Sequence, residues 1–148
     1  MPKSISLTKR AYLAGFLDGD GSVYVRLKPN KTYRFGYQVA LYIVLFQSQK
    51  EQSLFEKVCS MINLGHMRKR NDGISEYIIQ RIDAIKIFIP MVMPYVILKR
   101  RQLNLLSKII KERETISTKN DFLKLMAMID QFRDLNYSKR RIKRTLTP

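Results

Sequence analysis

The sequence predicts an α+β domain in which helices cover one face of an antiparallel sheet. Three observations support this prediction. Two segments of the first half alternate between apolar and polar residues, as strands do, two further short strands are predicted after them, and segments with helical periodicity precede, separate and follow the strand pairs. The second face of the strands is basic and polar. The predicted order is α-β-β-α-β-β-α followed by additional C-terminal helices, an arrangement typical of the α+β class.

The first predicted helix spans residues 7–19, with Ser6 as its N-cap. Its two faces carry different side chains: Leu13, Phe16 and Leu17 on one, and Tyr12, Gly15 and Gly19 on the other. A glycine inside a helix costs up to about 1 kcal/mol relative to alanine, so two glycines four residues apart require a reason. One reason is tight packing on the rest of the fold. The other is the close approach of a second, equivalent helix.

The first strand pair is predicted at residues 22–28 and 34–46, joined by a turn at 29–32. Alternation in the second strand creates an apolar face of Phe35, Tyr37, Val39, Leu41, Ile43 and Leu45. Its opposite face carries Arg34, Gln38, Ala40, Tyr42 and Val44. We expect the apolar face to pack on helices and the opposite face, which is rich in hydrogen-bonding groups, to lie outside the core.

The remaining elements complete the predicted order. They are a helix at 50–62, strands at about 64–70 and 75–82 with a turn at 71–73, a helix capped by Asp83 that Pro90 and Pro94 interrupt or offset, and helices at 96–113 and 119–136. Thr118 and Asp121 have the spacing of a capping box. No linker or repeat divides the chain, so we interpret residues 1–148 as a single domain with a basic tail at about 137–148.

The net charge is the most informative property of the composition. The chain has 28 Lys and Arg against 12 Asp and Glu, a net charge of +16, which indicates a nucleic-acid partner whose phosphates release counterions. No membrane partner is expected, because the basic residues are spread over the chain and not gathered on one amphipathic helix. Cys59 is the single cysteine, which argues against a disulfide or a cysteine-based zinc site. We expect an intracellular protein, in the cytoplasm of a prokaryote or in an organelle.

Residues 13–21 read Leu-Ala-Gly-Phe-Leu-Asp-Gly-Asp-Gly. This run resembles the signature of the LAGLIDADG homing endonucleases, with six of its nine positions identical to that name. The resemblance covers about residues 7–136, and the αββαββα order predicted above is the order of that fold. Because the motif occurs once, the chain is similar to the homodimeric branch. The resemblance implies an intron-encoded enzyme of intron homing, which makes a staggered double-strand cut in a long pseudo-palindromic DNA target by metal-dependent phosphodiester hydrolysis.

The chemistry of such a cut explains the motif. Mg²⁺ prefers oxygen ligands, often one or two carboxylates with phosphate oxygens. The Asp20 carboxylate and the Gly19 carbonyl are the expected ligands, with Mg²⁺ as cofactor and Mn²⁺ as a substitute. Two motif helices packed through Tyr12, Gly15 and Gly19 would bring both copies of Asp20 near a two-fold axis. Asp18, an acid at a helix C-terminus, is expected to cap or orient the motif and not to bind metal.

Two further catalytic candidates follow from the resemblance. Gln47 ends the second strand, where the family often holds a polar side chain that orders active-site water, and Lys99 resembles the lysine placed near the cleaved phosphate. The alternatives are an ordinary strand-end residue and a solvated basic helix start. The chain departs from close relatives at Glu51, where a basic residue is common, and the neighbouring Lys50 is a candidate replacement.

Sequence readout is expected from the basic sheet face. Arginine can grip guanine, and asparagine or glutamine adenine, with two hydrogen bonds, while lysine sets position on phosphates. Tyrosine can meet thymine methyl groups, sugars or phosphates. The predicted DNA-binding residues are Tyr24, Arg26, Lys28, Asn30, Tyr33, Arg34, Gln38, Tyr42, Arg68 and Arg70. The alternative is a solvated sheet face, which antiparallel sheets often have.

The net charge and the basic sheet face also fit a protein of the same fold that does not cut DNA. The two alternatives are an RNA-splicing helper (maturase) that binds intron RNA and a DNA-binding regulator. Asp20 distinguishes these from a nuclease. A pure binder gains nothing from a carboxylate facing phosphate, because like charges repel. The sequence therefore favours a Mg-dependent endonuclease acting on double-stranded DNA.

Overall fold

The computed structural model describes residues 5–136, so the basic tail predicted at 137–148 lies outside the described residues. The described chain divides into two compact units, each built from two segments. The first unit consists of residues 5–23 and 42–100, and the second of residues 24–41 and 101–136.

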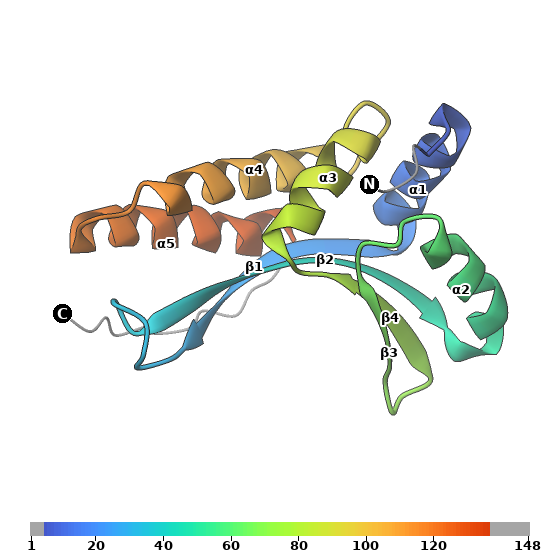
Figure 1. The fold of residues 1–148 in the computed structure, drawn as a ribbon, viewed down its shortest axis with the longest axis horizontal. Helices are drawn as coiled ribbons and strands as arrows, with labels where there is room; N and C mark the ends of the chain where they lie inside the picture. The colour runs from blue at the N-terminus through green and yellow to red at the C-terminus, as the bar shows by residue number, and fades with distance from the viewer. Residues whose placement is uncertain (1–4, 137–148) are drawn as a thin grey trace. The chain divides into compact units, whose positions relative to one another are not determined.

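The elements follow in the predicted order (Figure 1). They are α1 (Leu7–Asp20), β1 (Gly21–Pro29), β2 (Tyr37–Ser48), the 3₁₀ turn η1 (Gln49–Glu51), α2 (Gln52–Ser60), β3 (His66–Lys69), β4 (Ile74–Ile79), α3 (Ile82–Val92), α4 (Arg100–Glu114) and α5 (Lys119–Leu135). The four strands form one sheet in the order β1-β2-β4-β3, and β4 pairs antiparallel with both β2 and β3. The predicted α+β class is confirmed.

Two predicted element starts lie too early in the chain. The second strand begins at Tyr37 and not at 34, because a turn occupies the preceding residues, with Asn30 donating its N–H to the Gly36 carbonyl at 2.8 Å. Gly36 adopts a φ of 84°, a left-handed conformation that glycine takes at no steric cost. The helix predicted from 96 begins at Arg100, after a non-helical segment that matters for the site below.

In the first unit, helices cover one face of the sheet. The register pairs Ile43 with Ile79 and Leu45 with Tyr77, so these four side chains share a face, and all are at most 5% exposed. From the same face Ser75 donates a hydrogen bond from its hydroxyl to Gln52 at the start of α2. Helix α1 packs beside α3 and buries Leu13, Ala14 and Leu17 (Figure 1).

The opposite face is not accessible along its whole length, and this corrects one prediction. Tyr42 is 8% exposed and Val44 1%, although both were predicted to lie outside the core. Val44 is paired with Ile78, itself 8% exposed, so apolar side chains meet across strands on this face as well. Alternation identified the faces, but it could not show that the middle of β2 is buried on both. Tyr42 therefore does not lie on an accessible DNA-binding face.

A second correction concerns α3. The predicted interruption at Pro90 does not occur, because the helix runs through Pro90 to Val92. Proline removes one helical hydrogen bond, but its neighbours Phe88, Ile89 and Val92 are buried, and their packing offsets that loss. Asp83 lies in the first turn of the helix, and Arg81 occupies the N-cap position that was predicted for Asp83.

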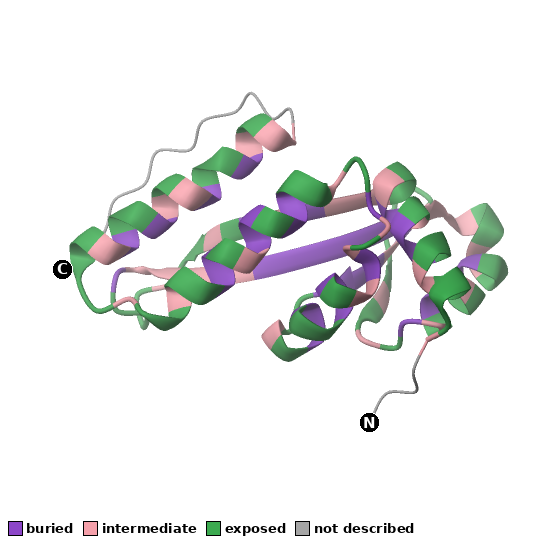
Figure 2. Cartoon of the chain, turned by 90° about the horizontal axis from the view of Figure 1, so that it is seen from above, coloured by how far each residue is buried: buried purple, intermediate pink, exposed green. Residues whose placement is uncertain are grey.

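The second unit contains α4 and α5, whose buried residues follow one side of each helix (Figure 2). Phe122 at the start of α5 stacks on Phe35 with ring centroids 5.0 Å apart. At the other end, the Gln102 side chain donates from Nε2 to the Leu135 carbonyl at 3.2 Å. None of the helices within residues 5–136 is both long and apolar enough to span a membrane.

The capping box of α5 predicts a pH-dependent stability. The Asp121 carboxylate accepts the N–H of Ser117 at 3.1 Å and of Thr118 at 3.0 Å, and these bonds lower the pKa of Asp121 to about 2 from 3.8. A carboxyl whose pKa is depressed by folding stabilises the folded state above its unfolded pKa and loses that contribution as the pH falls through the folded value. We therefore expect Asp121→Asn to lower the Tm at pH 7, and the difference from wild type to shrink between about pH 4 and pH 2.

Thermal unfolding followed by circular dichroism across this pH range tests the prediction. Asp134→Asn is the control, because it removes an acid near the C-terminal end of the same helix, where the helix dipole disfavours negative charge. This control should leave the Tm unchanged or raise it slightly. A Tm loss in Asp121→Asn that is as large at pH 2 as at pH 7 would contradict the assigned cause.

Candidate active site and nucleic-acid interface

The motif helix α1 presents Asp20 as its last residue, and the next residue already belongs to β1. Gly21 makes this direct passage possible. A Cβ at Gly21 would lie 2.6 Å from the Leu17 carbonyl oxygen and 2.9 Å from the Leu17 Cα, so no other residue fits there without a backbone shift. Asp20 is exposed, and within residues 5–136 its carboxylate has no hydrogen-bond or ion-pair partner.

The two motif glycines answer the question raised by the sequence. A Cβ added at Gly15 or Gly19 would meet no atom within 4 Å in the described part of the chain. Gly65 differs, because a Cβ there would lie 2.2 Å from the Ile78 carbonyl oxygen. Gly65 is thus required by the packing of its own chain, whereas Gly15 and Gly19 are not. Of the two reasons considered, tight packing on the same fold does not explain them.

Asp18 connects the motif to a distant segment. Its carboxylate accepts the backbone N–H of Ile97 at 2.8 Å and of Lys99 at 3.0 Å, one on each oxygen. Lys99, the last residue before α4, is thereby held against the motif helix. The prediction that Asp18 orients the motif named the right kind of role, but the sequence offered no sign of the partner segment.

Gln47 lies on the helix-covered side of the sheet, since its cross-strand partner is the buried Ser75. Its side-chain oxygen accepts the N–H of Ser48 at 2.9 Å. The next residues form η1, where Lys50 and Glu51 are both exposed. The catalytic roles of Gln47 and Lys99, and the replacement by Lys50, stay predictions.

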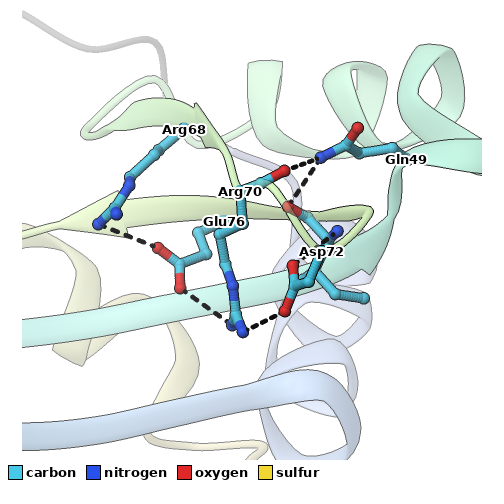
Figure 3. A network of polar contacts seen from close by, with 6 residues as sticks. Gln49, Arg68, Arg70, Asp72 and Glu76 are labelled. Carbon is cyan, nitrogen blue, oxygen red and sulfur yellow. Dashed lines mark hydrogen bonds and ion pairs between the residues drawn. The ribbon is translucent and has the colours of Figure 1, made fainter.

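On the opposite face of the first unit, two arginines share two carboxylates (Figure 3). Glu76 lies 3.9 Å from Arg68 and 3.4 Å from Arg70, and Arg70 also pairs with Asp72 in the turn. Gln49 secures this turn by donating from Nε2 to the carbonyls of Arg70 and Ile74, at 2.7 and 3.1 Å. Ion pairs at such accessible positions add little stability, but they place both guanidinium groups beside the Glu76 carboxylate.

Sequence reasoning missed Glu76, Asp72 and Gln49. The sequence did contain a signal for Glu76. A hairpin centred on Asp72 places Arg68 opposite Glu76, and the register of β3 and β4 has this pair. Gln49 carried no such signal, since its partners come from a turn more than twenty residues later.

The predicted readout residues of the second unit are mostly accessible. Arg26, Lys28, Tyr33 and Arg34 are exposed, and Tyr24, Asn30 and Gln38 are partly so. The Arg26 guanidinium lies 5.3 Å from the centre of the Tyr24 ring, a cation–π arrangement that orients it. Asn30 holds the turn itself, because its Oδ1 accepts both the N–H and the hydroxyl of Thr32, at 3.0 and 2.7 Å. A two-bond contact of Asn30 with adenine therefore requires these bonds to open.

The described residues contain no cluster of three or more His, Cys, Asp or Glu that could hold a metal by themselves. The Asp20 carboxylate and the Gly19 carbonyl nevertheless fit Mg²⁺, which is commonly held by one or two carboxylates with phosphate oxygens and water. Burial, reinforced by the Glu56 charge, raises the pKa of the Cys59 thiol to about 12, so Cys59 provides no thiolate ligand near neutral pH.

Known proteins are similar to this chain in both sequence and fold. A family model described as LAGLIDADG endonuclease matches residues 13–110. The DNA endonuclease I-CreI of Chlamydomonas reinhardtii is 36% identical over 131 residues, which is 88% of this chain and 80% of that protein. I-CvuI of Chlorella vulgaris is 34% identical over 104 residues, 70% of this chain and 65% of that protein.

Solved structures agree with these matches. A crystal structure of I-CvuI in complex with the I-CreI target in 2 mM Mg, with the DNA not cleaved, superposes with a TM-score of 0.84 at 29% identity, over 91% of this chain and 86% of that one. I-CvuI with its own target in 2 mM Ca also gives 0.84, at 28% identity over 93% and 87% of the two chains.

Proposed function

We propose a function from one premise, which is that this chain belongs to the LAGLIDADG endonuclease family. The chain is a site-specific homing endonuclease that hydrolyses phosphodiester bonds of DNA. We assign it a staggered double-strand cut in a long pseudo-palindromic target. We also propose that it acts inside the cell, in the cytoplasm of a prokaryote or in an organelle.

The observation that supports cutting is the state of Asp20. The carboxylates of Asp18, Asp72 and Glu76 each have a hydrogen-bonding or ionic partner, but Asp20 is exposed without one in the described chain. On a protein with a charge of +16, an acid that faces a polyanion weakens binding unless it holds a cation there. Asp20 is therefore assigned as a metal ligand.

We assign Mg²⁺ as the cofactor, held by the Asp20 carboxylate and the Gly19 carbonyl, with Mn²⁺ as a substitute. When bound, the cation supplies Lewis-acid stabilisation of charge at the scissile phosphate. Gln47 orders water at the site, and the Lys99 ammonium faces the phosphate and its developing charge.

A homodimer completes the site. Asp18 is occupied by backbone N–H groups, so one chain offers a single motif carboxylate, Asp20, to a metal ion, and a double-strand cut needs two sites. The described part of the first unit exposes six large apolar side chains at between 40% and 79%, which are Leu7, Tyr12, Leu54, Ile87, Ile97 and Leu98. Large exposed apolar residues favour association, and the open faces of Gly15 and Gly19 admit a second helix closely.

We expect Asp20→Asn to abolish cleavage and to retain DNA binding. Asparagine has the same shape but no charge to hold the cation, and a loss of about 3 kcal/mol or more corresponds to at least about a 100-fold slower cut. The measurement is incubation with intron-free DNA from the source organism and Mg²⁺, followed by sequencing of new ends. Asp134→Asn is the control acid, on α5.

A few reproducible staggered cuts, made by wild type and Asp134→Asn alone, support the assignment. Equal cleavage by Asp20→Asn would reject Asp20 as the metal ligand. No cuts from a folded wild-type protein, with binding to intron RNA, would favour the splicing helper instead.

For the dimer, we expect Gly15→Leu to leave the fold intact and to weaken self-association at least about tenfold, a change of about 1.4 kcal/mol. The leucine meets no atom of its own chain near its Cβ, but it occupies the space that a second helix needs. Sedimentation velocity measures the association. Ala127→Leu, an equally exposed position on α5, should behave as wild type. Unchanged association in Gly15→Leu would remove α1 from the interface.

Glu76 should limit unspecific DNA binding. We expect Glu76→Gln to bind unrelated duplex DNA more tightly, because Arg68 and Arg70 lose a shared carboxylate and become available to phosphates. The slope of log K against log salt should steepen by about 0.9 for each phosphate gained. Asp83→Asn, which also removes a carboxylate paired with an arginine, Arg81 at 2.8 Å, is the matched control. Equal effects of the two variants would mean that net charge alone is responsible.

A further inference from the structure

The motif contains two carboxylates, and the structure uses them differently. Asp20 is exposed without a partner in the described chain, whereas both oxygens of Asp18 are engaged by backbone N–H groups of Ile97 and Lys99, at 2.8 and 3.0 Å. These partners lie 79 and 81 residues further along the chain. Hydrogen bonds from N–H groups to a carboxylate are among the stronger hydrogen bonds in proteins.

The segment that Asp18 holds lies between the end of α3 and the start of α4. Val96 is fully buried, and its carbonyl accepts a hydrogen bond from the Arg100 side chain at 2.8 Å. Ile97 and Leu98, in contrast, are 79% and 68% exposed. Between the buried Val96 and the start of α4, Leu98 and Lys99 form a turn, and the Asp18 carboxylate binds the backbone N–H groups of Ile97 and Lys99.

The position of Asp18 in α1 makes this contact informative. An acid in the last turn of a helix is disfavoured by the dipole of that helix, so its presence there calls for a compensating interaction. The two N–H groups supply it. Because Asp18 and Asp20 belong to the same rigid turn, the contact also sets the Lys99 backbone at a fixed place relative to Asp20.

We propose that Asp18 is a positioning residue. Its carboxylate holds the Ile97–Lys99 backbone so that the Lys99 ammonium lies near the same scissile phosphate at which Asp20 holds the metal ion. Asp18 itself touches neither metal nor DNA. The inference rests on the function proposed above for Lys99, and it adds the group through which the motif helix controls that lysine.

A double-mutant cycle tests the proposal. Single-turnover cleavage rates and DNA affinities are measured for wild type, Asp18→Asn, Lys99→Met and the double variant. Asparagine keeps one acceptor oxygen and sets an NH₂ group against the other N–H, so one hydrogen bond is lost. We expect Asp18→Asn alone to cleave about 10- to 100-fold more slowly with DNA affinity within about threefold of wild type.

The decisive comparison is the Lys99→Met background. If Asp18 acts through Lys99, Asp18→Asn lowers the rate there by less than about threefold. A loss of the same size in both backgrounds would overturn the proposal and leave Asp18 a structural residue. Cleavage by Lys99→Met at the wild-type rate would instead reject the function proposed for Lys99, and the positioning role with it.

Hydrogen exchange provides a measurement that does not depend on the variants folding. In the wild-type protein, the amides of Ile97 and Lys99 should exchange more slowly than the amide of Leu98, which lies between them. Exchange of all three at the rate of an unstructured peptide would show that the Asp18 contact is not formed in solution, and would overturn the proposal.

Discussion

The absence of a side chain at Gly21 is the constraint on which the candidate site depends. Helix α1 ends at Asp20 and β1 begins at Gly21, with no residue between them. The strand leaves so close to the last helical turn that a Cβ would strike the backbone of Leu17. Asp20 is therefore the last residue of a helix that buries Leu13, Ala14 and Leu17, and its own side chain is exposed.

The same tight end places Asp18 where it can reach the backbone of Lys99. The two acids of the motif therefore have different surroundings and different roles. One faces solvent at the end of the helix and is available to a cation. The other faces the protein, where two N–H groups occupy it. Two residues apart on a helix, the two acids point about 200° away from each other around its axis, which explains why the spacing of the motif matters as much as its composition.

Electrostatics shapes the rest of the surface. A net charge of +16 supplies the electrostatic attraction that binding to a polyanion requires, and this attraction does not depend on the base sequence. Discrimination between DNA sequences therefore has to come from contacts of individual side chains with bases. The carboxylates of Asp72 and Glu76 lie beside Arg70, and Glu76 also lies beside Arg68, so a phosphate has to compete with these carboxylates for the two arginines. Arg26 lies against the Tyr24 ring in a comparable way.

The sequence by itself determined the order of elements, the catalytic motif and the basic character of the sheet, because periodicity, capping spacing and charge are local properties. It predicted the capping box at Thr118 and Asp121, which the structure confirms. Only the tertiary structure decided that Tyr42 is buried, that α3 continues through Pro90 and that Asp18 meets Lys99. These three facts depend on what packs against a residue from far along the chain, and no window of neighbouring residues contains that information.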